Sequence, residues 1–253
     1  MIRAALISLM LVLAWPAAGE EVVAGLSQNQ ISITTNFDGS EILIFGAVRR
    51  EEPVPEGAPL EVIITVAGPS EPIVVRRKEK RFGIWVNVDA VEVDRAPSFY
   101  AVATSSDWPQ VIRDVEDLRH KVSISRAIRS VGAPQTVADA PTFTNALIRI
   151  RKGSGLYQTN IGAVDLAQET LFNTRVTLPA NLTEGDYAVR FLLTRGGQVI
   201  STHNTAIFVQ KVGLERWLFN LAHDQPLIYG LMSLAIAIAA GWAASAFFRY
   251  LRG

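Results

Sequence analysis

The sequence predicts a mainly β protein: two immunoglobulin-like β-sandwich modules with a short helical connection, plus one C-terminal transmembrane helix. Short apolar or alternating runs rich in β-branched residues recur between Gly, Pro and Asp turn signals, which is typical of antiparallel sandwiches. Helical periodicity interrupts these runs between about 107 and 153. Residues 227–248 carry no charge and, at about 1.5 Å per residue, are long enough to cross a hydrocarbon core about 30 Å thick.

These observations divide the chain into seven expected segments. They are a signal peptide at 1–19, a first β-sandwich domain at 20–106, a helical connector at 107–155, a second β-sandwich domain at 156–210, an amphipathic juxtamembrane helix at 211–225, the transmembrane helix at 226–248 and a cytoplasmic tail at 249–253.

The N-terminus has the pattern of a secretory signal. Arg3 precedes an apolar stretch at 4–15, Pro16 breaks it, and small residues at 17–19 offer a cleavage site before a polar chain begins. The alternative is an uncleaved anchor, but the apolar stretch is short for a span. We therefore expect export with cleavage near Gly19.

The first module is predicted from a series of strands. Runs at 31–37 and 41–48 flank Asp38-Gly39, which predicts a hairpin with a tight turn. A Pro-rich loop follows, and further strands are expected within 60–68, 72–77, 82–93 and 98–105. We expect Phe82 and Trp85 to pack in the core of this module.

The connector is predicted to contain two helices that join the modules. Four apolar residues share one face of the first helix: Val111, Ile112, Val115 and Leu118. The second helix is expected around Phe143, Leu147 and Ile150, and it should end near Gly153 and Gly155.

The second module is predicted from runs at 175–179, 186–195 and 199–210. Gly196-Gly197 suits a two-residue hairpin loop. The run Glu-Gly-Asp-Tyr makes Tyr187 a candidate tyrosine corner, in which the hydroxyl bonds to the backbone upstream. An ordinary buried tyrosine explains the same pattern equally well.

The segment before the predicted span, at 211–225, is amphipathic. Leu214, Trp217, Leu218 and Leu221 share one face of a predicted helix, and Pro226 separates it from the span. This helix either lies on the outer leaflet or packs against the second module. The sequence leaves both alternatives open.

Arg249 and Arg252 follow the span at once, and the positive-inside rule therefore places the C-terminus in the cytoplasm. Together with an exported N-terminus, this predicts a single-pass protein with residues 20–225 outside. That region holds 24 Asp and Glu but 21 Lys and Arg, because Arg3, Arg249 and Arg252 lie beyond it.

Composition excludes several classes of function. The chain has no cysteine, its three histidines are far apart, and its formal net charge is zero. Disulfides and thiolate chemistry are excluded, and we expect no metal, no cofactor and no nucleic-acid partner. No nucleophile–base pair stands out, so we expect a protein that is not an enzyme.

Two sets of residues are candidate contact sites. The basic run at 76–81 is either a solvated hairpin tip or a contact for an anion or lipid headgroup through Arg76, Arg77, Lys78 and Arg81. Small residues recur every fourth position in the span, at Ser233, Ala237, Gly241 and Ser245. Such a stripe lets another helix approach closely, from a partner or a second copy, although small residues are common in membrane helices.

Several stretches resemble a known family. They are GLSQNQISITTNFDGSEILIFGAV, PSFYAV, ALIRIRKGSGLYQ, TLFNTRVTLPANLTEGDYAV and the final IYGL…GW…FFR. The chain resembles the Alph_Pro_TM family of alphaproteobacterial transmembrane proteins over nearly all of its mature length. The resemblance implies a bacterial inner-membrane protein with a periplasmic N-terminus. Genes of such proteins lie beside one for a transporter of the sulfite-exporter type, which implies an accessory role in sulfur-anion export.

Three functions remain open. The first is an interaction or accessory module for a membrane transporter, with the lipid bilayer and an integral membrane protein, or a second copy, as partners. The alternative is a periplasmic protein that binds or senses a small anion. An envelope enzyme is the least favoured, because the sequence offers no catalytic set to carry it.

Overall fold

The computed structural model describes residues 20–34, 37–50, 53, 57–131, 137 and 139–252. The expected signal peptide at 1–19 lies outside the described residues, as does the last residue of the expected tail. The chain divides into two compact units. The first contains residues 38–209 together with the chain up to 31, and the second contains 32–37 and 210–253.

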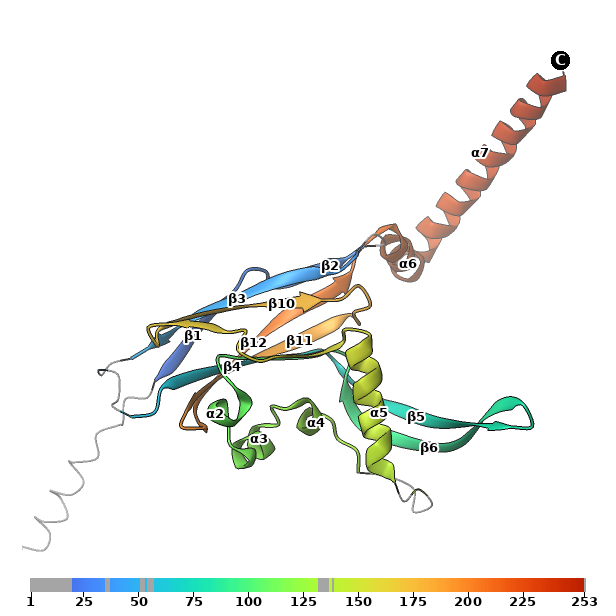
Figure 1. Cartoon of the computed structure of the whole chain (residues 1–253). Coiled ribbons are helices and arrows are strands. Elements are labelled where there is room, and N and C mark those ends of the chain that lie inside the picture. Colours follow the sequence, from blue (N-terminus) through green and yellow to red (C-terminus); the bar gives the residue numbers. More distant parts are fainter. Residues whose placement is uncertain are drawn as a thin grey trace, which may run out of the picture. The chain divides into compact units, whose positions relative to one another are not determined.

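The first unit contains three sheets and a set of helices (Figure 1). The four-stranded sheet has the order β1 (Glu21–Leu26), β3 (Ser40–Arg49), β10 (Leu171–Leu178), β9 (Asp165–Ala167). The six-stranded sheet has the order β2 (Gln30–Ile33), β12 (Gln198–Lys211), β11 (Gly185–Arg195), β4 (Leu60–Ala67), β7 (Tyr100–Thr104), β8 (Tyr157–Asn160). A separate hairpin pairs β5 (Ser70–Arg81) with β6 (Ile84–Pro97). Between β7 and β8 lie α2 (Trp108–Val111), α3 (Asp114–His120), α4 (Ile124–Ala127) and α5 (Ala140–Gly153).

The two larger sheets pack face to face. Phe172 of β10 and Phe191 of β11 are both buried, and their ring centroids lie 5.8 Å apart across the interface. The Phe172 ring lies over Gly46 of β3, where an added Cβ would come within 2.4 Å of it. The absence of a side chain at Gly46 therefore makes room for the aromatic pair that joins the sheets.

The centre of the six-stranded sheet is buried on both faces. β4 and β7 have almost no exposed residue, and their sequences, LEVIITVA and YAVAT, are apolar at nearly every position. One face meets the four-stranded sheet, and the other packs against the helical segment through residues such as Val102, Val111 and Leu147. The continuous apolar runs thus indicate strands covered on both sides.

The helices are a crossover connection. β7 and β8 pair in parallel, with Tyr100 opposite Tyr157. Parallel neighbours cannot be joined by a tight turn, so the chain must return to the starting edge across one face of the sheet. The helical segment makes this return and covers that face, whereas the sequence analysis expected a connector between two modules.

The mainly β class and the single apolar C-terminal helix are confirmed, but the two immunoglobulin-like modules are not. Strands from the two expected modules pair with each other: β3 with β10, and β4 with β11. Periodicity shows which face of a strand is buried, but it does not show which strand lies beside it.

The hairpin predicted around Asp38-Gly39 is wrong. β2 lies in the six-stranded sheet beside β12, and β3 lies in the four-stranded sheet. The turn therefore passes the chain from one sheet to the other. The two-residue hairpin at Gly196-Gly197 is confirmed, because Arg195 pairs with Gln198 and both glycines have positive φ.

The first predicted helix is broken. Val111 and Ile112 are buried as expected, but Val115 and Leu118 are exposed. The chain is extended at Arg113, whose N–H donates to the carbonyl of Gly197 at 3.0 Å rather than to the helix. The second predicted helix is confirmed as α5, which buries Phe143 and Leu147.

The core position predicted for Phe82 and Trp85 is wrong. Both lie at the far end of the β5–β6 hairpin and are exposed, as is the neighbouring Ile84. The alternation of this run does give a buried face, at Val91 and Val93, but residues 82–85 at the far end of the hairpin lie beyond the core that covers it.

The second unit contains α6 (Leu214–Asp224) and α7 (Pro226–Arg252). Among the described residues, one helix is long and apolar enough to cross a membrane, at Pro226–Phe247, and none of it is buried in the protein. The predicted amphipathic helix is present as α6, and Phe219 stacks on His223 at 4.0 Å between ring centroids. Its two expected positions, on the leaflet or against the body, stay predictions.

The aromatic pair between the sheets predicts a large effect on stability. Phe172→Ala should lower the free energy of unfolding by about 3–5 kcal/mol, because it leaves a cavity in the core. Phe208→Ala, at a partly exposed aromatic of β12, is the control and should cost much less. Thermal unfolding of the full chain in detergent measures both, and equal losses would contradict the packing argument.

Candidate functional site

The predicted basic run lies on β5, and one of its members is neutralised. Arg77 donates to Asp89 on the paired strand and, at 2.6 Å, to Asp139 at the start of α5. Its guanidinium also lies over the Phe143 ring, 5.1 Å from the centroid. Arg77 therefore links α5 to the β5–β6 hairpin, and its charge is already paired with two carboxylates.

This contact changes the acidity of both partners. The hydrogen bonds that Arg77 donates to Asp89 and Asp139 raise the pKa of Arg77. The hydrogen bond from Arg77 lowers the pKa of Asp139 below its usual value of 3.8. The charged forms are thus the ones that the fold stabilises.

The other members of the run are exposed. Arg76 and Lys78 flank Arg77 on the same strand, and Arg81 is 3.3 Å from Glu79. The structure does not gather them into a concave site. It places them along the projecting hairpin instead (Figure 1).

Tyr187 is buried, and its hydroxyl donates to the carbonyl of Thr183 at 2.7 Å, four residues upstream. That bond is the feature that characterises a tyrosine corner. Burial raises the pKa of the Tyr187 phenol, so the hydroxyl stays protonated and continues to donate. Its ring packs 6.0 Å from that of Phe99. Tyr187 holds the entry to β11 and has no opening to a ligand.

The small residues of the span lie along α7. Ser233, Ala237, Gly241 and Ser245 are exposed, and a Cβ added at Gly241 would have nothing within 4 Å. The hydroxyl of Ser233 donates to the carbonyl of Tyr229 at 2.7 Å, so it is satisfied within the helix. Nearly all of α7 is exposed, so the stripe differs from the other faces in its small side chains and not in its exposure.

A different group of cations forms the strongest candidate site. A groove of about 650 Å³ lies between β6, β11 and the segment from α3 to residue 131. Its lining includes five cationic side chains: Arg95, Lys121, Arg126, Arg129 and Arg190. None of the described residues that line it is Asp or Glu. We call this surface the basic groove.

Two of its arginines are held side by side by the backbone. Arg95 of β6 and Arg129 form an isolated antiparallel bridge, with N–H···O distances of 3.1 and 2.8 Å in the two directions. Residues directly opposite in such a bridge project to the same face, and like charges there repel. The described residues offer neither arginine a salt bridge. An anion between them would relieve the repulsion.

A third arginine is fixed by neutral groups. Arg190 donates to the carbonyls of His120 and Lys121 at 2.8 and 3.2 Å and to the hydroxyl of Thr65 at 3.1 Å. Carbonyl and hydroxyl oxygens orient a guanidinium without cancelling its charge. Arg190 thus adds a positioned positive charge to the wall of the groove.

The loop that carries Lys121 is rigid for identifiable reasons. Asp117 accepts hydrogen bonds from the N–H groups of Val122 and Ser123, at 3.0 and 2.7 Å, and from the Ser123 hydroxyl. Tyr100 donates to the carbonyl of Val122 at 2.7 Å. Burial raises the pKa of Tyr100, so this donor is retained at neutral pH.

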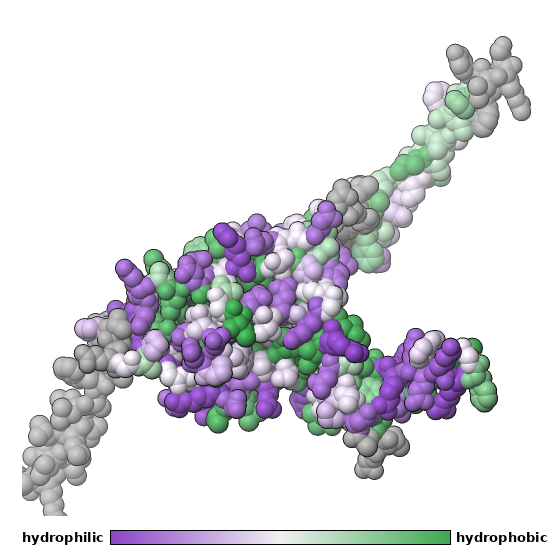
Figure 2. Space-filling view, viewed as in Figure 1, coloured by the Kyte–Doolittle hydropathy of each residue, from purple (hydrophilic) through white to green (hydrophobic). Residues whose placement is uncertain are grey.

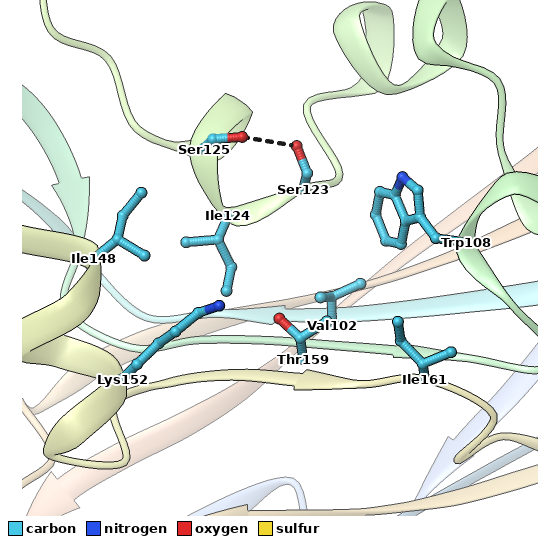
Figure 3. Close-up of a pocket in the computed structure, with 9 residues that line it drawn as sticks. All are labelled: Val102, Trp108, Ser123, Ile124, Ser125, Ile148, Lys152, Thr159 and Ile161. Atoms are coloured by element: carbon cyan, nitrogen blue, oxygen red, sulfur yellow. Dashed lines mark hydrogen bonds between the residues drawn. The ribbon is translucent and has the colours of Figure 1, made fainter. Parts of the chain in front are cut away.

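A second, smaller pocket lies on the other side of α4. It has a volume of about 310 Å³, and Figure 3 shows its lining. Apolar side chains dominate, among them Trp108, Ile124 and Ile148, and Lys152 extends its amino group toward them. One cation among apolar groups is a weaker anion site than five around one groove.

The sequence analysis missed the basic groove because its cations are scattered. Three of them lie within residues 121–129, but Arg95 and Arg190 are distant in the sequence, and the fold brings them together through the Arg95–Arg129 bridge and the return of β11 beside β4. A run such as 76–81 is visible in sequence, whereas a cluster that depends on strand pairing is not.

Comparison with known families supports the membrane assignment. The model of the family described as "Putative transmembrane protein (Alph_Pro_TM)" matches residues 21–250. The chain belongs to this family. The resemblance inferred from the sequence is confirmed, and family membership and the one apolar helix among the described residues, α7, fit a single-pass membrane protein. None of the curated proteins compared with the chain matches it.

The Arg77–Asp139 contact predicts a dependence of stability on pH. Because the pKa of Asp139 is lowered in the folded chain, its contribution to stability is complete above its usual pKa of 3.8 and is lost as pH falls through the folded value. In Asp139→Asn this contribution is absent. The variant should therefore have a lower melting temperature than the wild type at pH 7. This difference in melting temperature should become smaller when the pH falls below the usual pKa of an aspartate. A constant difference across the acid range would contradict the assignment.

Proposed function

We propose that this single-pass membrane protein binds a small oxyanion in the basic groove and presents it to a partner in the same membrane. The observation that carries the proposal is the convergence of five cationic side chains on one groove whose described lining has no carboxylate. Arginine forks suit planar or tetrahedral oxyanions because they donate parallel hydrogen bonds. Family resemblance favours a sulfur oxyanion such as sulfite or sulfate.

The location is part of the proposal. Arg249 and Arg252 after the span favour a cytoplasmic C-terminus, which places the β-rich unit outside the cytoplasm, on the outer side of the inner membrane. Export of the N-terminus after signal cleavage agrees with this orientation. The groove would then meet anions of the periplasm.

The groove predicts a specific loss of affinity. Arg95→Gln/Arg129→Gln should weaken binding of sulfite or sulfate at least about tenfold, because each charge-assisted hydrogen bond contributes roughly 1.5–3 kcal/mol. Isothermal titration of the full chain in a neutral detergent measures the affinity, which should also fall as salt increases.

The matched control is Arg175→Gln, at an exposed arginine of β10 in the other sheet. It removes a charge but leaves the basic groove intact, so the affinity should stay at the wild-type value. Equal affinity in the wild type and the double variant, with unchanged melting temperatures, would refute the groove as the anion site.

A second function is an accessory role for a membrane transporter. It is favoured by the exposed small stripe on α7, where packing rather than water exclusion drives helix association. A groove that gathers anions beside a transporter would raise their local concentration. The two functions are compatible, since one uses the outer unit and the other uses the span.

The stripe predicts which face of the span contacts the partner. Gly241→Leu should reduce co-purification of a multi-span companion, because its side chain prevents close approach of the helices. Ala239→Leu, on the opposite face at about 100° per residue, is the control and should leave recovery unchanged. Mass spectrometry after gentle extraction measures recovery, and equal yields from both variants would refute the stripe as the contact.

A further inference from the structure

The far end of the β5–β6 hairpin combines exposed apolar residues with cations. Phe82, Ile84 and Trp85 are 106%, 64% and 68% exposed. Figure 2 shows this apolar end beyond a hydrophilic stretch of the hairpin. All the side chains from 78 to 85 are exposed, so the body of the protein does not cover them. We call residues 82–85 the hairpin tip.

The tip is apolar on both faces. Ile84 lies opposite Arg81 and Trp85 lies opposite Lys80 in the antiparallel register. Because successive residues of a strand point to opposite faces, Ile84 and Trp85 project in opposite directions, with Phe82 at the apex. A flat protein surface would cover one of these faces, whereas an apolar medium surrounds both.

The apex residue has a conformational cost. Phe82 has φ = 50° and Gly83 has φ = 85°, which is the backbone of a two-residue hairpin turn. Asn, Asp or Gly is favoured at the first position, and a bulky residue there is strained by about 1–2 kcal/mol. Neither the turn geometry nor packing within the unit explains a phenylalanine at this position.

Cations surround the tip. Residues 76–81 contain five Lys and Arg and one Glu, and Arg77 alone is held by two carboxylates. Aromatic side chains favour the interface of a bilayer, and each basic residue near an anionic leaflet adds about 1 kcal/mol. The hairpin end has an aromatic apex followed by cations. This arrangement suits the headgroup region of a bilayer, where aromatic rings lie in the interface and cations meet lipid phosphates.

We propose that the hairpin tip inserts into the headgroup region of the bilayer that holds α7, with Phe82, Ile84 and Trp85 in the interface and Lys78, Lys80 and Arg81 on lipid phosphates. The anchor keeps that bilayer at high local concentration. Insertion is shallow, because the edges of a two-stranded ribbon leave backbone groups that hydrocarbon cannot satisfy. It also stabilises the exposed end of the ribbon, since two strands without other cover are marginal in water.

The absence of cysteine makes a direct test possible. A spin label on Ile84→Cys reports the tip, and a label on Val74→Cys, an exposed position on β5 before the cationic residues, is the control. The full chain is placed in nanodiscs of phosphatidylcholine and phosphatidylglycerol. The tip label should lose collisions with a water-soluble nickel complex and gain collisions with oxygen, whereas the control label should stay aqueous.

Two further variants test whether the apex and the cations cause the shielding of the label at position 84. Phe82→Asn retains a residue suited to the turn, so the fold should persist while the label at 84 returns to water. Lys78→Glu/Lys80→Glu should have the same effect, and nanodiscs of phosphatidylcholine alone should give weaker shielding. A label at 84 that stays aqueous in anionic nanodiscs would overturn the proposal. Shielding that requires added vesicles or a protein companion would overturn it too, in favour of a facing membrane or a protein partner.

Discussion

The burial of β4 and β7 on both faces is the constraint on which the rest of the first unit depends. Strands that are apolar at nearly every position need a cover on each side. The four-stranded sheet supplies one cover through contacts such as Phe172 with Phe191. The helical crossover between β7 and β8 supplies the other, and its path over the sheet determines where residues 120–131 lie.

The basic groove is a consequence of that path. The crossover brings Arg129 against β6, and the same segment presents carbonyls to Arg190 of β11. Two other arginines of the unit are neutralised: Arg50 and Arg195 both pair with the well-buried Glu20, at 2.6 and 2.9 Å. Arg95 and Arg129 have no such carboxylate partner among the described residues, and this contrast supports the proposed anion site.

Local signals in the sequence predicted local structure well. The Gly196-Gly197 turn, the helix around Phe143 and the apolar span each depend on a few adjacent residues, and each was predicted. Strand partners depend on the whole chain, which is why the expected modules and the hairpin at Asp38-Gly39 failed. The basic groove also depends on strand partners, since Arg95 and Arg129 become neighbours through strand pairing.

The zero net charge of the chain hides this distribution. Composition excluded a global attraction to anions, yet the cations of the groove and of the hairpin form two local concentrations of positive charge. Over distances beyond about 10 Å such charges are screened at ordinary salt, so each acts on a ligand at its own surface. The proposed binding of an anion in the groove and of an anionic bilayer at the hairpin is therefore compatible with a neutral chain, because each would depend on a local arrangement of charge and not on the total charge.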